Sequence, residues 1–113
     1  MRRSTAAILA IVVVIGAAGA QAASKDSKVT IHYDNNTFSG RVTSTEQGCE
    51  AYRQVKLFKK KAGAKKLITS TPTDEDGKWL VFADKGMKGR FYALVLASDD
   101  GCDRDRSRTI EVG

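Results

Sequence analysis

The stretch RFYALVLAS, residues 90–98, decides the fold of this 113-residue chain. Beyond the first 22 residues it is the only segment that is apolar on both of its alternating faces. Odd positions from 91 to 95 would face one side of a β-strand, and even positions from 92 to 96 the other. Because such a run suits a strand covered on both sides, or one near the middle of a sandwich, we predict a central strand here.

Shorter segments on either side of this strand alternate polar and apolar residues, as half-buried strands do. Turn signals separate them, of which Asp76-Gly77 is the strongest and Gly63, which can adopt positive φ, is another. Pro72 lacks the N–H that a ladder needs, so the strand before it is predicted to lie at a sheet edge. The further predicted strands cover 29–33, 38–45, 55–58, 67–71, 79–83 and 109–112.

These strands determine the predicted fold class. Residues 59–66 are predicted to form the connection of a hairpin between the third and fourth strands. After the N-terminal region no segment shows a sustained helical apolar period, so no helix of consequence is predicted. Seven short strands at a spacing of about ten residues predict an all-β fold, a seven-stranded antiparallel β-sandwich of immunoglobulin-like architecture.

The N-terminus has the layout of a secretory signal peptide. Arg2 and Arg3 precede an apolar run over 6–15, and Ala20-Gln21-Ala22 fits the small-residue cleavage pattern. The alternative is a retained membrane anchor, but the apolar run together with the small residues after it, roughly 15 residues, is shorter than the ~20 that a span needs. We therefore predict a cleaved signal peptide over 1–22, of bacterial appearance. The protein would be secreted, extracellular or in the cell envelope, with no membrane span after cleavage.

Cleavage would leave residues 23–113 as a single β-sandwich domain. Without Arg2 and Arg3, 17 of the 19 Lys and Arg residues remain against 13 Asp and Glu, a net charge of about +4. A domain of this size buries only about 60 to 65 per cent of its unfolded surface. A covalent cross-link would therefore stabilise it substantially.

Cys49 and Cys102 are the only cysteines, and we predict that they form a disulfide. The bond would close a loop of about 54 residues and contribute on the order of 4 kcal/mol. Two free thiols, two metal ligands and a redox pair are the alternatives. A metal site is disfavoured because His32 is the single histidine, and a redox pair because the close spacing and activating neighbours of a reactive thiol are missing.

Four motifs, in order along the chain, resemble a known family. They are Gly40-x-Val42, Val55-x-Leu57, Thr73-Asp74 followed by Gly77-x-Trp79-x-Val81, and Gly89-x-Phe91-x-Ala93-x-Val95. This order resembles that of the carboxypeptidase regulatory-like and transthyretin-like (prealbumin-like) modules over about residues 38–112. The resemblance implies a seven-stranded sandwich and a non-catalytic module that spaces, stabilises or binds.

Two departures limit what this resemblance implies. The enzymatic branch, the hydroxyisourate hydrolases, uses several histidines and a tyrosine-rich tail, whereas this chain has His32 alone and ends in TIEVG. That activity is therefore not carried over, and we do not expect an enzyme. The cysteine pair departs from the common regulatory module and is more like that of small secreted relatives of transthyretin, in which a disulfide ties loops at one end.

The predicted strands imply a separation of charge between the two ends of the sandwich. If consecutive strands alternate in direction, the loops after the second, fourth and sixth strands meet at one end, which brings Cys49 and Cys102 together. Nine of the 13 acids would lie there: Glu46, Glu50, Asp74, Glu75, Asp76, Asp99, Asp100, Asp103 and Asp105. The opposite end would carry seven lysines, our candidate anion-binding residues: Lys59, Lys60, Lys61, Lys65, Lys66, Lys85 and Lys88.

A lysine cluster of this density suits an anionic polymer, such as a surface polysaccharide or acidic lipid head groups. The alternative is a solvated hairpin tip that protects a sheet edge and keeps the protein soluble. Nucleic acid is not expected as a partner, because no aromatic residue stands among the lysines to stack on bases.

We expect no catalytic residues, no metal site and no cofactor. His32 falls on the solvent face of its strand, and the serines have no histidine and acid beside them in sequence. The spacing of the acids over 99–105 does not match a calcium-binding loop, and arginines are interleaved with them. Trp79 and Phe91 are interpreted as core residues rather than the lining of a ligand pocket.

The expected function is that of an exported, non-catalytic β-sandwich module with a structural or binding role. Its partner is unknown, and another envelope protein is one possibility. The alternative function is a lysine-mediated binder of an anionic cell-surface glycan or envelope polymer.

Overall fold

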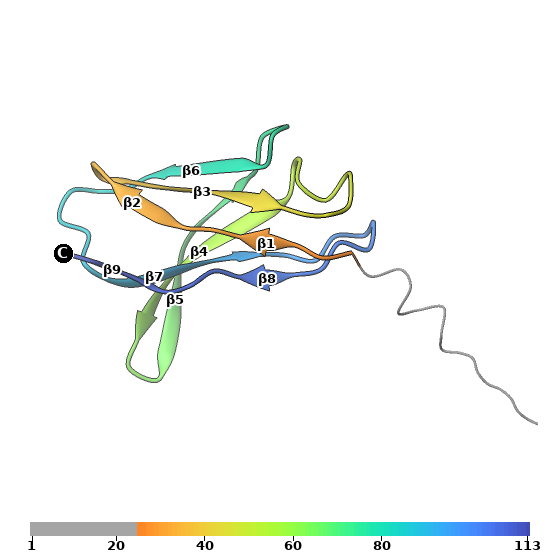
Figure 1. Ribbon diagram of the computed structural model, residues 1–113. Helices are drawn as coiled ribbons and strands as arrows, with labels where there is room; N and C mark the ends of the chain where they lie inside the picture. Colours follow the sequence, from red (N-terminus) through yellow and green to blue (C-terminus); the bar gives the residue numbers. More distant parts are fainter. Residues whose placement is uncertain (1–24) are drawn as a thin grey trace, which may run out of the picture.

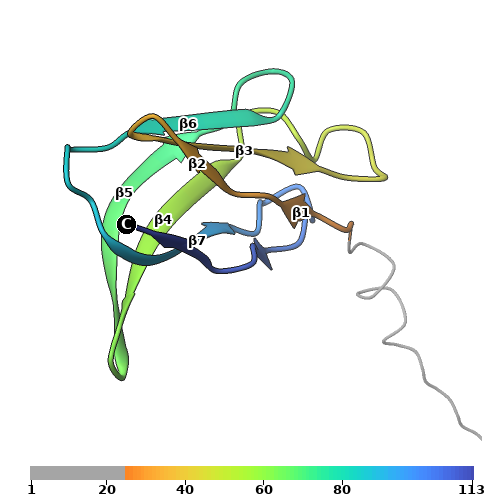
Figure 2. The same ribbon diagram turned by 60° about the vertical axis from the view of Figure 1, so that its left-hand side comes forward.

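The computed structural model describes residues 25–113, and the predicted signal peptide over 1–22 lies outside the described residues. All regular secondary structure in this part of the chain is β-strand, in two antiparallel sheets of four and five strands (Figures 1 and 2). The prediction of an all-β antiparallel sandwich is confirmed. The strands are β1 Lys28–Val29, β2 His32–Asp34, β3 Thr37–Thr43, β4 Gln54–Lys61, β5 Ala64–Pro72, β6 Lys78–Phe82, β7 Gly89–Val95, β8 Asp105–Arg106 and β9 Ile110–Val112.

In the four-stranded sheet, β3 is central and pairs with β6 on one side and with both β1 and β2 on the other. β1 and β2 keep one register along β3, since Val29 lies opposite Val42 and His32 lies opposite Ser39. The single strand predicted over 29–33 is therefore two strands with a short interruption at residues 30–31.

The indole of Trp79 on β6 reaches this interruption. It crosses over Gly40 of β3 and donates a hydrogen bond from Nε1 to the carbonyl oxygen of Thr30, at 3.1 Å. Because that oxygen is taken by the indole, the N–H of Arg41 donates to Thr30 Oγ1 instead, at 3.0 Å. A Cβ at position 40 would lie 2.0 Å from the Thr30 oxygen and 2.6 Å from Nε1, so only glycine leaves room for the crossing.

Gly40→Ala is expected to lower the free energy of unfolding by about 2 kcal/mol, because its methyl group overlaps a backbone oxygen and the indole. Urea unfolding of the purified protein measures the change. Ser39→Ala, on the adjacent position of β3, is the matched control and should change stability by less than about 0.5 kcal/mol. If both variants are as stable as the wild-type protein, the crossing does not constrain position 40.

The five-stranded sheet is built around β4 and β7, with β5 at one edge and both β8 and β9 paired with β7 at the other. Between β8 and β9 the register on β7 shifts by one residue. Ser107 bridges the shift, because its N–H donates to the Ala93 carbonyl and its Oγ accepts from the Ala93 N–H, both at 2.8 Å. Residues 25–113 thus contain nine strands where seven were predicted.

β7 is buried on both faces, as predicted for 90–98, although the strand ends at Val95. Its odd positions join the main core between the sheets, together with Phe38, Val42, Val55, Leu57 and Trp79. Its even positions, Tyr92 and Leu94, pack with Phe58 into a second cluster on the outer face of the five-stranded sheet. Trp79, 2% exposed, and Phe91, fully buried, are core residues as interpreted.

Cys49 and Cys102 form a disulfide whose Cα atoms are 5.6 Å apart. This confirms the predicted bond, and the loops that carry the two cysteines meet at the end of the sandwich near residue 25 (Figure 1). The alternatives with free thiols or metal-bound thiols are excluded, since the described residues contain no free cysteine.

Arg53 lies beside the disulfide and holds this end together. Its side chain is only 4% exposed. The guanidinium donates hydrogen bonds of 2.6 to 2.9 Å to Ser27 Oγ and to the carbonyl oxygens of Cys49, Leu96 and Asp103. Burial lowers the pKa of Arg53, while the carboxylate of Asp103 acts in the opposite direction. One side chain therefore connects four separate segments.

Candidate functional site

The lysine hairpin is the most strongly charged part of the fold, and we define it as Lys59, Lys60, Lys61, Lys65 and Lys66 at the tip of β4 and β5. The predicted connection over 59–66 is wrong in extent: the two strands continue to Lys61 and from Ala64, and only Ala62 and Gly63 form the turn. Gly63 has φ of +68°, the conformation expected of it. All five lysines therefore lie in strands.

Strand pairing sets these lysines directly opposite one another. Lys59 lies opposite Lys66, and Lys60 lies opposite Lys65. Opposed side chains have Cβ atoms about 4.5 to 5.5 Å apart, and like charges in this position are destabilising. The sequence from 54 to 72 contains no acidic residue to offset them.

The two lysine pairs point to opposite faces of the hairpin, because side chains alternate along a strand. Lys59 is on the core side, with Nζ 6.0 Å from the centre of the Phe91 ring. Lys65 is on the outer side, with Nζ 4.7 Å from the centre of the Phe58 ring. The tip projects past the rest of the sandwich (Figures 1 and 2), so it presents positive charge on both faces.

Lys85 and Lys88, the other two predicted anion-binding residues, lie in the loop between β6 and β7. Lys88 lies against the C-terminal residue, since a Cβ at Gly113 would be 2.9 Å from Lys88 Cγ. Lys59 reaches the start of β7, where a Cβ at Gly89 would be 2.8 Å from its Cε. The fold thus brings five lysines together in the hairpin and leaves two in a separate loop (Figure 1).

Two aromatic rings lie under the outer side of the hairpin. Phe58 and Tyr92 stack with ring centres 5.4 Å apart, and the guanidinium of Arg106 lies 3.9 Å from the centre of the Tyr92 ring. The premise that no aromatic residue stands among the basic residues is therefore wrong for the folded chain. The rings are only 8% and 5% exposed, because Lys65 and Arg106 cover them. Absence of nucleic-acid binding stays a prediction.

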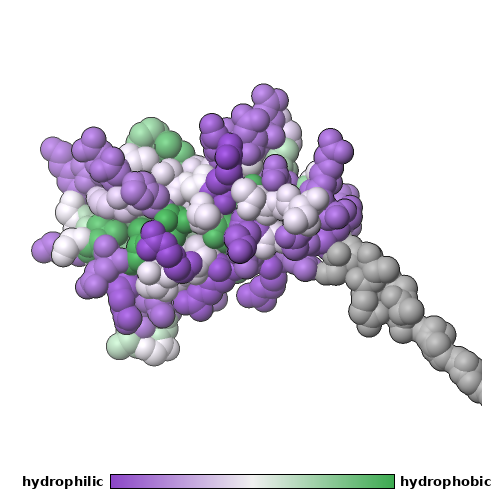
Figure 3. Space-filling model, viewed as in Figure 1, coloured by the Kyte–Doolittle hydropathy of each residue, from purple (hydrophilic) through white to green (hydrophobic). Residues whose placement is uncertain are grey.

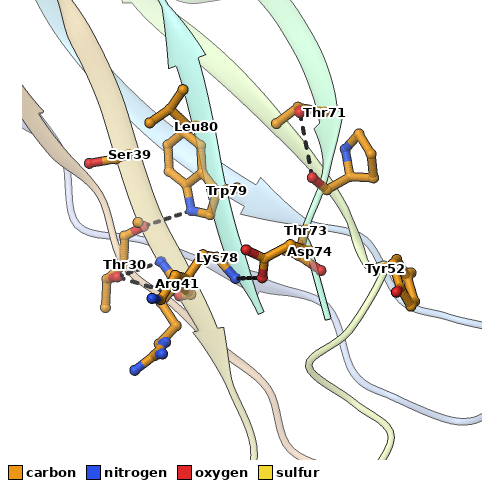
Figure 4. A pocket seen from close by; sticks show the side chains of 12 residues that line it. Thr30, Ser39, Arg41, Tyr52, Thr71, Thr73, Asp74, Lys78, Trp79 and Leu80 are labelled. Carbon is orange, nitrogen blue, oxygen red and sulfur yellow. Dashed lines mark hydrogen bonds between the residues drawn. The ribbon is translucent and has the colours of Figure 1, made fainter. Parts of the chain in front are cut away.

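A groove of about 850 Å³ runs between the end of β5 and the neighbouring parts of β3 and β6 (Figure 4). Its charged residues are Arg41, Asp74 and Lys78, and its lining contains no histidine or cysteine. The Asp74 carboxylate accepts the backbone N–H groups of Lys78, at 2.9 Å, and Asp76, at 2.8 Å. The bond from Lys78 is the main cause that lowers the pKa of Asp74. Asp74 is therefore a turn residue whose Oδ1 accepts two backbone N–H groups.

A second groove, of about 220 Å³, continues along the same side of the molecule between Ile68 and Thr69 of β5 and Val81 and Phe82 of β6. On the exposed face of β6 beside this groove, Leu80 and Phe82 are 49% and 80% exposed. This surface was not predicted from the sequence, although Leu80 and Phe82 alternate with the more buried Trp79 and Val81 and so mark an apolar outer face. The role of Arg53 was not predicted either.

The remaining predicted positions lie elsewhere in the fold. His32 is exposed on β2, as predicted. Asp105 fastens the two sheets together, since its Oδ2 accepts the backbone N–H of Val29 at 2.8 Å. Among residues 25–113, no three His, Cys, Asp or Glu residues come close enough to hold a metal ion. The described strands and loops also include no helix with the length and apolar character to cross a membrane.

Comparison with known proteins adds no assignment. No protein-family model, no curated protein and no solved structure matches the chain.

Proposed function

We propose that this protein is an exported, non-catalytic β-sandwich module that binds an anionic polymer of the cell surface or envelope through the lysine hairpin. The observation that carries the proposal is the pair of like-charged contacts, Lys59 opposite Lys66 and Lys60 opposite Lys65, at a projecting tip without acids. The motif resemblance to transthyretin-like modules, itself still a prediction, is compatible with such a role.

The alternative function for the hairpin is protection of an edge strand. A single lysine or proline on an edge is enough to discourage pairing with another chain, and β5 already ends at Pro72. Lysines that alternate with acids would keep the protein soluble without repulsion across the strands. The cost of two opposed lysine pairs is offset when an anionic chain lies along them. The two opposed lysine pairs therefore favour an anionic ligand over a role in solubility alone.

The groove of about 850 Å³ that contains Asp74 supports a non-catalytic role. Asp74, one of its three charged residues, is engaged by backbone N–H groups that keep its carboxylate ionised. A carboxylate with a lowered pKa is a poor general base or acid near neutral pH. The hairpin is therefore the better candidate for a functional surface.

Retention on immobilised heparin, used as a probe polyanion, tests the proposal. The triple variant Lys59→Ala, Lys60→Ala, Lys61→Ala is expected to elute at much lower salt, and the slope of log affinity against log salt should fall by about two to three. Loss of counterion release from the substituted lysines is the physical reason.

The matched control removes the same charge from exposed positions away from the hairpin, with Lys28→Ala, Arg104→Ala and Arg108→Ala. This control is expected to keep most of the retention. If both triple variants lose retention equally, net charge alone explains the binding and the hairpin is not the site. Both variants are first checked for unchanged thermal unfolding.

A further inference from the structure

β6 is a sheet edge with free backbone groups. It pairs with β3 alone among the described strands. Bonds from the Val42 N–H to the Gly77 carbonyl, and from the Ala83 N–H to the Asn36 carbonyl, show that odd residues of this segment face β3. Because antiparallel strands alternate, the backbone groups of even residues point away from β3. Asp74 hydrogen-bonds both the backbone N–H and the carbonyl oxygen of Lys78. Leu80 and Phe82 therefore form the free part of the edge.

The free part of this edge, at Leu80 and Phe82, lacks the usual protection against pairing. Edge strands are commonly guarded by lysine, proline or a bulge. β5, the edge of the other sheet on the same side, has lysines, Pro72 and a bulge opposite residues 57–58 of β4. β6 instead exposes Leu80 and Phe82 on its outer face, and Figure 3 shows an apolar patch over β6. The contrast singles out β6 as a pairing edge.

We propose that β6 pairs antiparallel with β6 of a second copy of this chain, about a two-fold axis at Val81. When two such edges pair, even-numbered residues lie opposite even-numbered residues, because these carry the outward-pointing backbone groups. Three registers then place Leu80, Phe82 or both at the centre of the contact. With Leu80 opposite the partner's Phe82, Lys78 lies opposite the partner's Asp84 at both ends. Lys78 shares the outer face of β6 with the two apolar residues. An extension of the strand by two residues in the dimer would bring Asp84 into the same alternation, so charge and apolar contacts agree in this register.

The two neighbouring registers lose this match. With Leu80 opposite the partner's Leu80, Asp84 falls opposite the partner's Asp76, which sets like charges against each other. With Phe82 opposite the partner's Phe82, Leu80 falls opposite the partner's Asp84 and no opposite charges meet. The self-complementary order Lys-x-Leu-x-Phe-x-Asp over 78–84 therefore selects both the occupant and the register.

The groove of about 220 Å³ beside this edge fits the same arrangement. Its lining combines apolar residues, among them Phe38, Ile68 and Val81, with Thr69 and Asp84, and it opens where β6 ends its own sheet. In the proposed dimer the partner's Val81 lies next to Val81 on the core side and covers this groove. Backbone bonds between Leu80 and the partner's Phe82 complete the sheet.

Light scattering coupled to size-exclusion chromatography of the mature protein, over a wide concentration range, tests the proposal. The wild-type chain is expected to be a dimer at high concentration. Lys78→Asp and Asp84→Lys, each alone, oppose like charges at both ends and should raise the dissociation constant about tenfold or more. The double variant Lys78→Asp, Asp84→Lys should restore it. Because Lys78 also lies near Asp74, Asp84→Lys is the cleaner single change.

A mixture of the two single variants is the most discriminating experiment. One chain then carries Asp at both 78 and 84, and the other carries Lys at both. They are expected to form a heterodimer in preference to either homodimer. Phe82→Lys should leave a folded monomer, as checked by thermal unfolding.

A monomeric wild-type chain, a dimer indifferent to the single changes, or a double variant that stays monomeric overturns the proposal. Binding of an unrelated extended peptide by a monomeric wild-type chain assigns the edge to another occupant. The double variant keeps the lysine hairpin and the net charge, so heparin retention is judged separately.

Discussion

Removal of the Cys49–Cys102 bond is expected to lower the free energy of unfolding by about 4 kcal/mol, the largest effect of any change considered. The bond joins residues 53 positions apart, so breaking it releases a long loop in the unfolded chain. For a domain of this size the melting temperature should fall by roughly 20 °C. Urea and thermal unfolding of the double variant Cys49→Ala, Cys102→Ala measure the loss.

Reduction of the wild-type protein is the matched control, because it breaks the bond and leaves both side chains in place. The reduced protein and the double variant should lose similar stability if the constraint on the unfolded chain is the main cause. Mass measurement after alkylation verifies that the thiols label only after reduction. A loss of less than about 1 kcal/mol in both samples would falsify the chain-entropy account of this bond.

Arg53→Met should lower the free energy of unfolding by about 3 kcal/mol, because it leaves several buried acceptors without a donor. The guanidinium donates hydrogen bonds to the hydroxyl of Ser27 and to three backbone carbonyl oxygens, those of Cys49, Leu96 and Asp103. Arg53→Lys is expected to lose nearly as much, since an ammonium group cannot reach acceptors that a planar fork spans. Chemical unfolding of both variants checks this result.

Arg104→Met serves as the control for Arg53→Met, because Arg104 is exposed in the loop that contains Cys102. Its stability should stay within about 0.5 kcal/mol of the wild-type protein. A close match between the two Met variants would mean that the hydrogen bonds of Arg53 contribute little. A fully stable Arg53→Lys variant would mean that the charge matters and the fork does not.

The lysine hairpin and the edge of β6 are separate surfaces on the same sandwich. The hairpin presents charge on β4 and β5 of the five-stranded sheet, whereas Leu80 and Phe82 lie on the outer face of the four-stranded sheet. In the proposed dimer each chain contributes one hairpin, so two proposed polyanion sites would act together and raise the apparent affinity for a long polymer. The charge-swap variants and the lysine variants separate these contributions.

Local patterns in the sequence were sufficient to predict most of the strands, although not β8, and much of the core. Alternation identified 90–98 as a strand buried on both faces, and β7 has that property. Asp76-Gly77 marked the turn before β6, where Gly77 has φ of +83°. The disulfide followed from two cysteines and the alternating direction of antiparallel strands. These features depend on neighbours along the chain or on the simple reversal of direction.

Tertiary structure alone decided which edges and which buried groups matter. Arg53 is central because Ser27, Leu96 and Asp103, all distant in sequence, converge on it together with the nearby Cys49. No local pattern in the sequence predicts that convergence. The lysine run looked like a loop until pairing set Lys59 against Lys66. Leu80 and Phe82 form an open edge only because β6 has β3 on one side and no strand on the other among the described residues. Sequence alone determined most of the strands, whereas the pairing of distant segments decides which backbone groups and side chains stay exposed.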